Sequence, residues 1–407
     1  MLVEADRVNL VGTYNELAAA HPEAVVVDFG ESILLPPMVN AHTHLELSHF
    51  ADWAAAAKPK TLQAPKTPQA PDVSQKFVDW ILWLVRVRRN IGEVELQASL
   101  ADGLRKSLSA GTGAVGDIFT TLSAVNAYQS SPLRGRIFAE VLGQDPSVVG
   151  DRLAAIGALC LHPPGADLNW GLSPHAPYTL SPATMNQVFA FADLKSLQCS
   201  IHLAESKAET DFMQNGTGMI ADKLFAAARW KLSANAAPGC SPVSALCRQG
   251  RLRPGDLAVH GVQVDAADIE QLKQTGCSVV LCPRSNATLD VGKAPVATYL
   301  NAGVPLALGT DSLASSSSLS VWDEMAFAMD WFAGEAEPCD WLEMATLGGA
   351  KALGIHDRMG QLATGYEASF QVVTLADMPV VDELEETLCT SGRDVEVTHL
   401  YLGGCQA

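Results

Sequence analysis

The sequence predicts an α/β fold, namely a (β/α)8 barrel of the TIM type with a small β domain built from both chain ends. Eight short, apolar, β-rich segments alternate with segments of helical pattern, and eight parallel strands are the number that closes such a barrel. The chain has 407 residues, which suffices for one large barrel and an annex. An open doubly wound sheet is disfavoured because no glycine-rich phosphate-binding turn follows the first strand.

Barrel strands and helices are expected in alternation. The expected strands span residues 32–39, 113–119, 135–142, 168–173, 198–203, 256–262, 278–282 and 304–309. The expected helices include residues 94–109, 182–194, 266–275 and 319–332. Apolar strands that alternate with helices indicate a parallel sheet whose two faces are covered, so residues 36–359 are assigned to the barrel.

Two terminal segments, residues 1–35 and 360–407, lie outside this barrel. They contain short β patterns at 24–28, 369–374 and 396–402, and the two ends of a barrel chain can meet on its outside. We therefore expect them to pair into one small β domain. An Ala- and Pro-rich segment, 52–73, predicts a long loop after the first barrel strand, on the side where active-site lids lie.

Charge and composition restrict the partners. Lys and Arg number 27 against 45 Asp and Glu, so the formal net charge of −18 disfavours nucleic acid. No apolar stretch approaches the roughly 20 residues that cross a bilayer, and no signal-peptide pattern opens the chain. The nine cysteines include no C-x-x-C pair, which is typical of reduced thiols. We expect a cytoplasmic homodimer with a small-molecule substrate and no membrane partner.

The strongest local signal is the pair His42 and His44 at the end of the first apolar strand. Residues i and i+2 of a strand point to the same face, so both imidazoles would aim into the barrel mouth. Three later strands end in His202, His260 and Asp311. Because strand ends carry the catalytic groups of this architecture, we predict that His42, His44, His202 and Asp311 hold one catalytic divalent metal. Zinc is the expected ion and iron the alternative, since nitrogen and oxygen ligands suit both.

These residues, in their sequence context, resemble the amidohydrolase superfamily. More narrowly they resemble its mononuclear-metal deaminase branch, which includes adenosine, S-adenosylhomocysteine and methylthioadenosine deaminases and chlorohydrolases. The motifs are residues 36–44 (PPMVNAHTH), 173–179 (SPHAPYT), 282–286 (CPRSN) and 309–312 (GTDS), with His202, Glu205 and His260. Superfamily members with two metals place a carboxylated lysine at the end of the fourth strand. Residues 168–175 contain no lysine, so the resemblance implies a single metal.

The catalytic roles are assigned to Glu205, His260 and Asp311. A divalent metal lowers the pKa of its bound water toward about 7, but deamination also needs an acid for the ring nitrogen and a proton for the ammonia. Glu205 lies three residues past His202 and is placed to do both; the alternative is a glutamate that stabilises a helix N-terminus. The free oxygen of Asp311 would take the proton from water. The resemblance implies that His260 orients the hydroxide, while the alternative is a buried structural histidine.

Substrate binding is assigned to four further residues. By resemblance His175 contacts the substrate, although the two prolines beside it also suit a structural role. Glu46 follows the histidine pair and points into the same mouth, where it would bind a ribose hydroxyl or support the metal histidines. Ser285 and Asn286 complete the set, with a simple turn as the alternative.

A nearly apolar segment, 77–90, ends in Arg86, Arg88 and Arg89. It is interpreted either as a helix at a subunit interface or as a lid helix whose arginine meets an anionic substrate group. Together with residues 40–48 it most resembles the aminodeoxyfutalosine deaminases of the futalosine route to menaquinone, whose substrate is an adenine nucleoside that carries a benzoate. The resemblance implies a hydrolytic deaminase that releases ammonia. The alternatives are deamination of adenosine, methylthioadenosine or S-adenosylhomocysteine, hydrolysis of a halide or another aminated heterocycle at the same site, or a non-catalytic scaffold.

Overall fold

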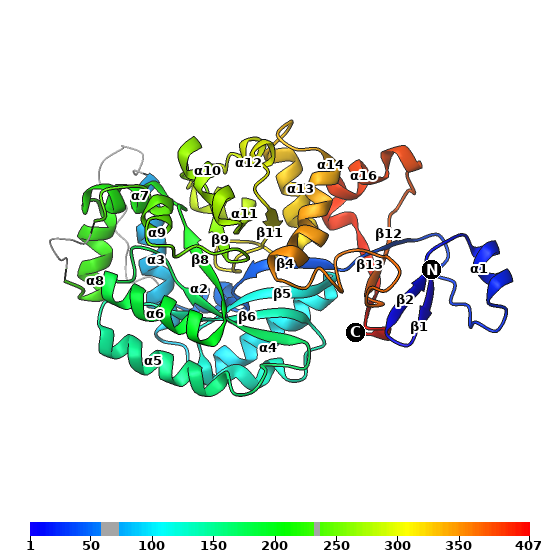
Figure 1. The fold of residues 1–407 in the computed structure, drawn as a ribbon, viewed down its shortest axis with the longest axis horizontal. Helices are drawn as coiled ribbons and strands as arrows, with labels where there is room; N and C mark the ends of the chain where they lie inside the picture. Colours follow the sequence, from blue (N-terminus) through cyan, green and yellow to red (C-terminus); the bar gives the residue numbers. More distant parts are fainter. Residues whose placement is uncertain (58–72, 232–236) are drawn as a thin grey trace.

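A closed barrel of parallel strands forms the body of the molecule (Figure 1). The computed structural model describes residues 1–57, 73–231 and 237–407. The barrel strands, in chain order, are β4 (Met38–Thr43), β5 (Thr112–Phe119), β6 (Arg134–Val141), β7 (Leu168–Pro174), β8 (Gln198–Leu203), β9 (Leu257–His260), β10 (Ser278–Leu281) and β11 (Leu306–Leu308). Each strand pairs in parallel with its neighbour in sequence. The (β/α)8 prediction is therefore confirmed.

The seam between the first and last strands closes just beyond β11. A parallel bridge joins Thr43 to Asp311, and the Asp311 backbone N–H donates to the His42 carbonyl over 3.1 Å. Gly309 makes this approach possible, because a Cβ at this position would lie 2.8 Å from the Cβ of His42. Barrel closure thus brings two of the predicted metal ligands together.

Helices surround the barrel, and α3 (Val73–Arg88) lies at its mouth (Figure 1). They are α2 (Phe50–Ala56), α3 (Val73–Arg88), α4 (Glu93–Ser109), α5 (Pro146–Leu159), α6 (Pro182–Lys195), α7 (Lys207–Asn215), α8 (Ala226–Ala228), α9 (Pro242–Cys247), α10 (Ala266–Thr275), α11 (Pro283–Leu289), α12 (Val296–Ala302), α13 (Val321–Trp331), α14 (Pro338–Glu343) and α15 (Gly349–Ala352). Buried residues of the strands, such as Val115 and Ile137, pack in one apolar cluster with helix residues such as Leu100 and Phe189. Within the described part of the chain, no helix is long and apolar enough to cross a membrane.

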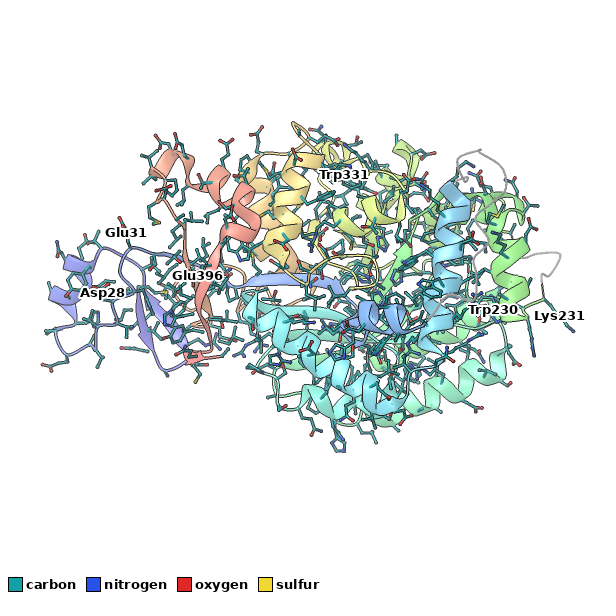
Figure 2. The ribbon with its side chains drawn as sticks, turned by 180° about the vertical axis from the view of Figure 1, so that it is seen from behind. Asp28, Glu31, Trp230, Lys231, Trp331 and Glu396 are labelled. Atoms are coloured by element: carbon teal, nitrogen blue, oxygen red, sulfur yellow. The ribbon has the colours of Figure 1, made fainter. Side chains whose placement is uncertain are left out.

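An antiparallel sheet of four strands lies at one end of the barrel. It has the order β14 (Cys405–Gln406), β13 (Glu396–Leu402), β12 (Phe370–Thr374) and β3 (Ile33–Leu35), and α16 (Leu384–Ser391) connects its two long strands. The N-terminal residues add a separate hairpin of β1 (Leu2–Glu4) and β2 (Arg7–Leu10), followed by α1 (Tyr14–Ala20). Figure 2 shows Asp28, Glu31 and Glu396 at this end of the molecule and Trp230 at the opposite end. The expectation of a small β unit from both chain ends is confirmed, while its boundaries at residues 35 and 360 stay a prediction.

Three local predictions differ from the structure. The expected strand 32–39 is two strands, since Pro36 and Pro37 have no N–H to donate to a sheet; β3 pairs with β12, and β4 begins at Met38. Segment 24–28 forms no strand, and its valines are exposed. Segment 52–73 was expected to be a loop, but its first residues belong to α2, where alanine favours helix. The rest of that segment, 58–72, lies outside the described residues.

Candidate metal centre and active site

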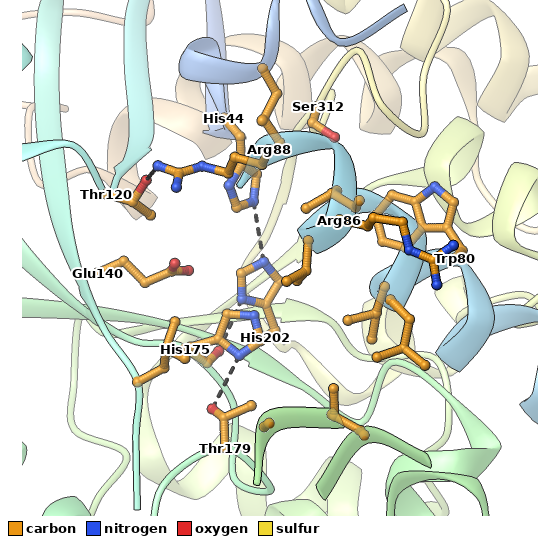
Figure 3. A pocket seen from close by; sticks show the side chains of 18 of the residues that line it. His44, Trp80, Arg86, Arg88, Thr120, Glu140, His175, Thr179, His202 and Ser312 are labelled. Carbon is orange, nitrogen blue, oxygen red and sulfur yellow. Dashed lines mark hydrogen bonds between the residues drawn. The ribbon is translucent and has the colours of Figure 1, made fainter. Parts of the chain in front are cut away.

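Three imidazoles and one carboxylate converge at the C-terminal mouth of the barrel. His42 lies in β4 with His44 just beyond it, His202 lies in β8, and Asp311 follows β11. The Nε2 atoms of His44 and His202 are 3.3 Å apart (Figure 3). Oδ1 of Asp311 lies 3.5 Å from Nε2 of His44 and 3.8 Å from Nε2 of His42. The four side chains thus come from the first, fifth and eighth barrel strands and meet at one point.

The donor set fits a divalent metal. Both ring nitrogens of His42 are buried without a hydrogen-bond partner among the described residues, which is costly unless another group binds them. One nitrogen from each of His42, His44 and His202 lies within 4.8 Å of the other two. Two nitrogens bound at about 2.0–2.1 Å to a tetrahedral ion are about 3.4 Å apart, close to the His44–His202 separation. Burial lowers the pKa of His44 to about 3, so its imidazole is in the neutral form that metals bind.

The two oxygens of the Asp311 carboxylate have different partners. Its Oδ2 accepts hydrogen bonds from the hydroxyls of Ser285 at 2.6 Å and Ser315 at 3.0 Å, while Oδ1 faces the imidazoles. Its backbone has φ 55°, in the left-handed region that is strained for a residue with a side chain. The backbone bridge to Thr43 stabilises this conformation, and so do the hydrogen bonds from the two serines.

Glu205 and His260 lie on one side of the imidazole cluster. Glu205 is buried, and its Oε1 is 3.6 Å from Nε2 of His260. Nδ1 of His260 donates to Oδ1 of Asn286 over 2.9 Å, which leaves Nε2 as the acceptor nitrogen. Burial, with the negative charges of Asp311 and Glu209 nearby, raises the pKa of the Glu205 carboxyl well above its usual range. This environment favours the protonated form of Glu205, which is the form that can donate a proton.

A cavity of about 700 Å³ opens in front of these groups. Its inner wall includes His175, His202, Glu205 and Glu140, and its outer wall is largely the apolar face of α3, including Trp80 (Figure 3). This volume lies within the range of small-molecule sites, about 300–1,000 Å³. The helix that was interpreted as either an interface or a lid thus lines the cavity.

Comparison with known proteins identifies the family of the chain. The family model described as "Amidohydrolase family" matches residues 33–406.

The chain belongs to the amidohydrolase family.

Two curated relatives resemble the chain over most of its length. The aminodeoxyfutalosine deaminase of Deinococcus radiodurans is 31% identical over 365 residues, covering 87% of this chain and 81% of that protein. The 5-methylthioadenosine/S-adenosylhomocysteine deaminase of Moorella thermoacetica is 27% identical over 415 residues, covering 99% and 88%. Among solved structures, Helicobacter pylori aminofutalosine deaminase in complex with methylthio-coformycin has a TM-score of 0.81 at 23% identity, covering 100% of this chain and 94% of that one. The predicted superfamily is confirmed, and the structural likeness supports the amidohydrolase fold.

The four residues assigned to substrate binding occupy two kinds of position in this amidohydrolase. His175 and Glu46 line the cavity. Ser285 and Asn286 are buried behind it, where they bond to Asp311 and His260. That placement suits the positioning of Asp311 and His260 better than contact with a substrate.

Sequence reasoning missed Glu209. Its carboxylate accepts hydrogen bonds from the backbone N–H groups of Ala204 at 3.1 Å and Glu205 at 2.9 Å. It therefore fixes the turn that presents Glu205, in which Ala204 has φ 52°. The signal was present, since Ser206 followed three residues later by Glu209 is the pattern of a helix N-terminus, and the Ser206 hydroxyl does accept from the Glu209 N–H.

Replacing Ser285 by alanine should weaken metal binding without emptying the site. Oδ2 of Asp311 would keep Ser315 but lose its shorter hydrogen bond, so the carboxylate would be less firmly oriented. Losing a group that orients a metal ligand typically lowers metal affinity about 10- to 100-fold. Competition with a chromogenic chelator measures this affinity. Ser312→Ala is the matched control, because the Ser312 hydroxyl is buried nearby but does not bond to Asp311. The metal affinity of this variant should match that of the wild type.

Proposed function

We propose that this amidohydrolase is a single-metal hydrolytic deaminase of an adenine-nucleoside-like substrate, with 6-amino-6-deoxyfutalosine as the preferred substrate. The observation that carries the proposal is the buried Glu205 beside His260 at the three-histidine, one-aspartate cluster, of which His44, His202 and Asp311 line the same cavity. An acid next to a water-activating centre is what hydrolytic deamination requires. The deaminase names of the two curated relatives point to the same reaction.

Each residue near the cluster has a defined task in this reaction. A divalent metal, when bound by His42, His44, His202 and Asp311, lowers the pKa of water so that it can attack at neutral pH. Nε2 of His260 accepts a hydrogen bond from the attacking water and orients it, and Oδ1 of Asp311 accepts a proton from it. Glu205 protonates the ring nitrogen next to the carbon that carries the amine. A new C–O bond forms, the C–N bond breaks, and the proton taken from water by Asp311 leaves with the amine as ammonia. The proton that remains on the new hydroxyl returns to Glu205, which restores the acid and leaves a carbonyl on the product.

A single zinc ion is proposed for the site. The fourth barrel strand, β7, contains no lysine that could bridge a second ion. Three imidazoles and one carboxylate are ligands that zinc favours, with room for a water.

The substrate proposal also rests on the arginines at the end of α3. Arg88 is occupied, since its guanidinium contacts the hydroxyls of Thr120 and Thr121 and lies 3.9 Å from Glu46. Arg86 and Arg89 also line the cavity, and no described residue forms an ion pair or hydrogen bond with either guanidinium. An arginine suits a carboxylate because its planar fork donates two parallel hydrogen bonds. We therefore assign the benzoate of the substrate to this pair, Arg86 and Arg89.

Ammonia release from a nucleoside panel tests the proposed function. The metal-assayed protein would be given aminodeoxyfutalosine, adenosine, methylthioadenosine, S-adenosylhomocysteine, guanine and cytosine. We expect the highest kcat/KM with aminodeoxyfutalosine. Preference for another adenine nucleoside would keep the reaction and reject the substrate. No ammonia from any compound, with about one metal bound, would reject the deaminase assignment.

A further inference from the structure

Glu140 is a carboxylate in the cavity with no role in the reaction above. It lies near the end of β6, the third barrel strand, and its side chain lines the cavity (Figure 3). Only 7% of the residue is exposed, and its Oε1 is buried without a hydrogen-bond partner. Within residues 1–57, 73–231 and 237–407, no group donates a hydrogen bond to either oxygen of this carboxylate. Burying such a group unpaired is costly, and burial raises the pKa of the Glu140 carboxyl to about 7. A ligand that donates hydrogen bonds to this carboxylate would relieve the cost.

The basic groups around Glu140 are already engaged elsewhere. Arg152 donates from Nε to the backbone carbonyl of Glu140 at 3.1 Å and from Nη2 to the carbonyl of Thr120 at 2.8 Å. Arg88 is held by the threonine hydroxyls described above. Neither guanidinium forms an ion pair with the Glu140 carboxylate, so the structure supplies no cation for it from these two neighbours.

A second metal ion is also a poor partner for Glu140. An oxygen of Glu140 and one nitrogen each of His175 and His202 lie within 4.8 Å of one another. However, Nδ1 of His202 bonds to the carbonyl of His175 at 2.9 Å, and its Nε2 faces His44 in the first cluster. His202 has no nitrogen left, and two remaining side chains are too few for a protein-held ion.

Glu46, which sequence reasoning assigned to a ribose hydroxyl, differs from Glu140 because its carboxylate has hydrogen-bond donors within the protein. Its oxygens accept three hydrogen bonds, from the N–H and hydroxyl of Thr120, both at 2.6 Å, and from the N–H of Thr121 at 2.8 Å. These bonds account for its burial without a ligand. Of the two carboxylates, Glu140 is the one whose acceptor capacity is unused.

We propose that Glu140, together with His175, binds the sugar hydroxyls of the substrate and selects ribonucleosides over deoxyribonucleosides. This inference rests on the proposed function, because it takes the substrate to be a nucleoside whose base lies at the metal centre. The two oxygens of one carboxylate can accept from adjacent hydroxyls. His175 uses Nδ1 on the Thr179 hydroxyl at 3.1 Å and has its other ring nitrogen for the same ligand.

Equilibrium binding of unreactive nucleosides tests the subsite independently of deamination. The probes are purine riboside, which lacks the amine, and its 2′-deoxy and 3′-deoxy analogues, measured by calorimetry on the metal-loaded protein. Binding is measured above about pH 8, because burial raises the pKa of the Glu140 carboxyl to about 7. A hydrogen bond to a charged group contributes a factor of about 10 to 100, so we expect the wild type to prefer the riboside by that factor over at least one analogue. In Glu140→Gln the preference should fall to within about threefold.

Two variants make the test decisive. Glu46→Gln is the matched control, since its partners are Thr120 and Thr121, and it should keep the wild-type preference. Glu140→Asp keeps a carboxylate but shortens the side chain, which moves the carboxylate away from the ligand. This variant should therefore lose part of the preference for the riboside. Because Glu140 is unpaired, Glu140→Gln should melt at the same or a higher temperature than the wild type without ligand.

Several results would overturn the inference. These are an unchanged preference in Glu140→Gln, a preference lost in Glu46→Gln instead, no binding of any riboside, or a lower melting temperature of Glu140→Gln that indicates a structural role. Riboside binding without ammonia release from adenine nucleosides would reject the proposed reaction and leave the subsite standing.

Discussion

Glu205→Gln should lower turnover by about 100-fold or more while the metal content stays at the wild-type level. The amide keeps the size of the side chain but has no acidic proton to give to the ring nitrogen. Glu205 is not among the four side chains that are proposed to hold the metal, so that cluster should remain intact. Steady-state ammonia release, with metal analysis on the same sample, measures both effects.

A neighbouring glutamate provides the comparison for this experiment. Glu209→Gln keeps one acceptor for the turn at Ala204 and Glu205 and leaves the acid in place. We expect a much smaller loss of turnover in Glu209→Gln, together with a lower melting temperature. Wild-type turnover in Glu205→Gln would remove Glu205 from the mechanism.

His202→Ala should abolish stable metal binding and activity together. This imidazole lies 3.3 Å from that of His44, and without it the remaining ligands are two histidines and one carboxylate. A metal bound only by the folded state adds about 2.7 kcal/mol of stability when its concentration is 100 times its Kd. The variant should therefore melt at the temperature of chelator-treated wild type, and added zinc should not raise that temperature. Metal analysis and thermal unfolding with and without chelator measure these effects.

His49→Ala is the control for His202→Ala. It shows whether the removal of an imidazole outside the cluster is enough to cause loss of the metal. His49 lies close to the cluster in sequence, but its Nε2 pairs with Asp102 at 3.1 Å on the helix side of the barrel. This variant should bind metal and respond to zinc as the wild type does. Full metal content in His202→Ala would mean that His202 is not a ligand.

Much of the barrel and the metal cluster was predictable because both depend on local patterns. Apolar runs of strand length locate the strands, and a His-x-His pair on a strand directs both rings to one face. Pro36 and Pro37 carried a further local signal, a break between two strands, which the apolar run around them obscured.

The pairing of side chains around the cluster could not be predicted in the same way. Asn286 bonds to His260 from 26 positions away, and Glu46 is satisfied by Thr120 and Thr121 more than 70 positions later. Glu46 and Glu140 are both acidic residues at strand ends, and sequence alone does not say which carboxylate finds donors in the protein. That distinction depends on long-range contacts, and it separates a structural glutamate from one that is open to a ligand.

Closure of the barrel through Thr43 and Asp311 also sets an order of events during folding. These residues are 268 positions apart, so the metal centre cannot be complete until the last strand has docked against the first. Contacts between such distant segments form late because their loop-closure entropy must be overcome first. During synthesis, a nascent chain that ends before residue 311 has its three histidines but lacks the carboxylate. Metal uptake should therefore mark completion of the barrel, and an ion added early should accelerate folding far less than it slows unfolding.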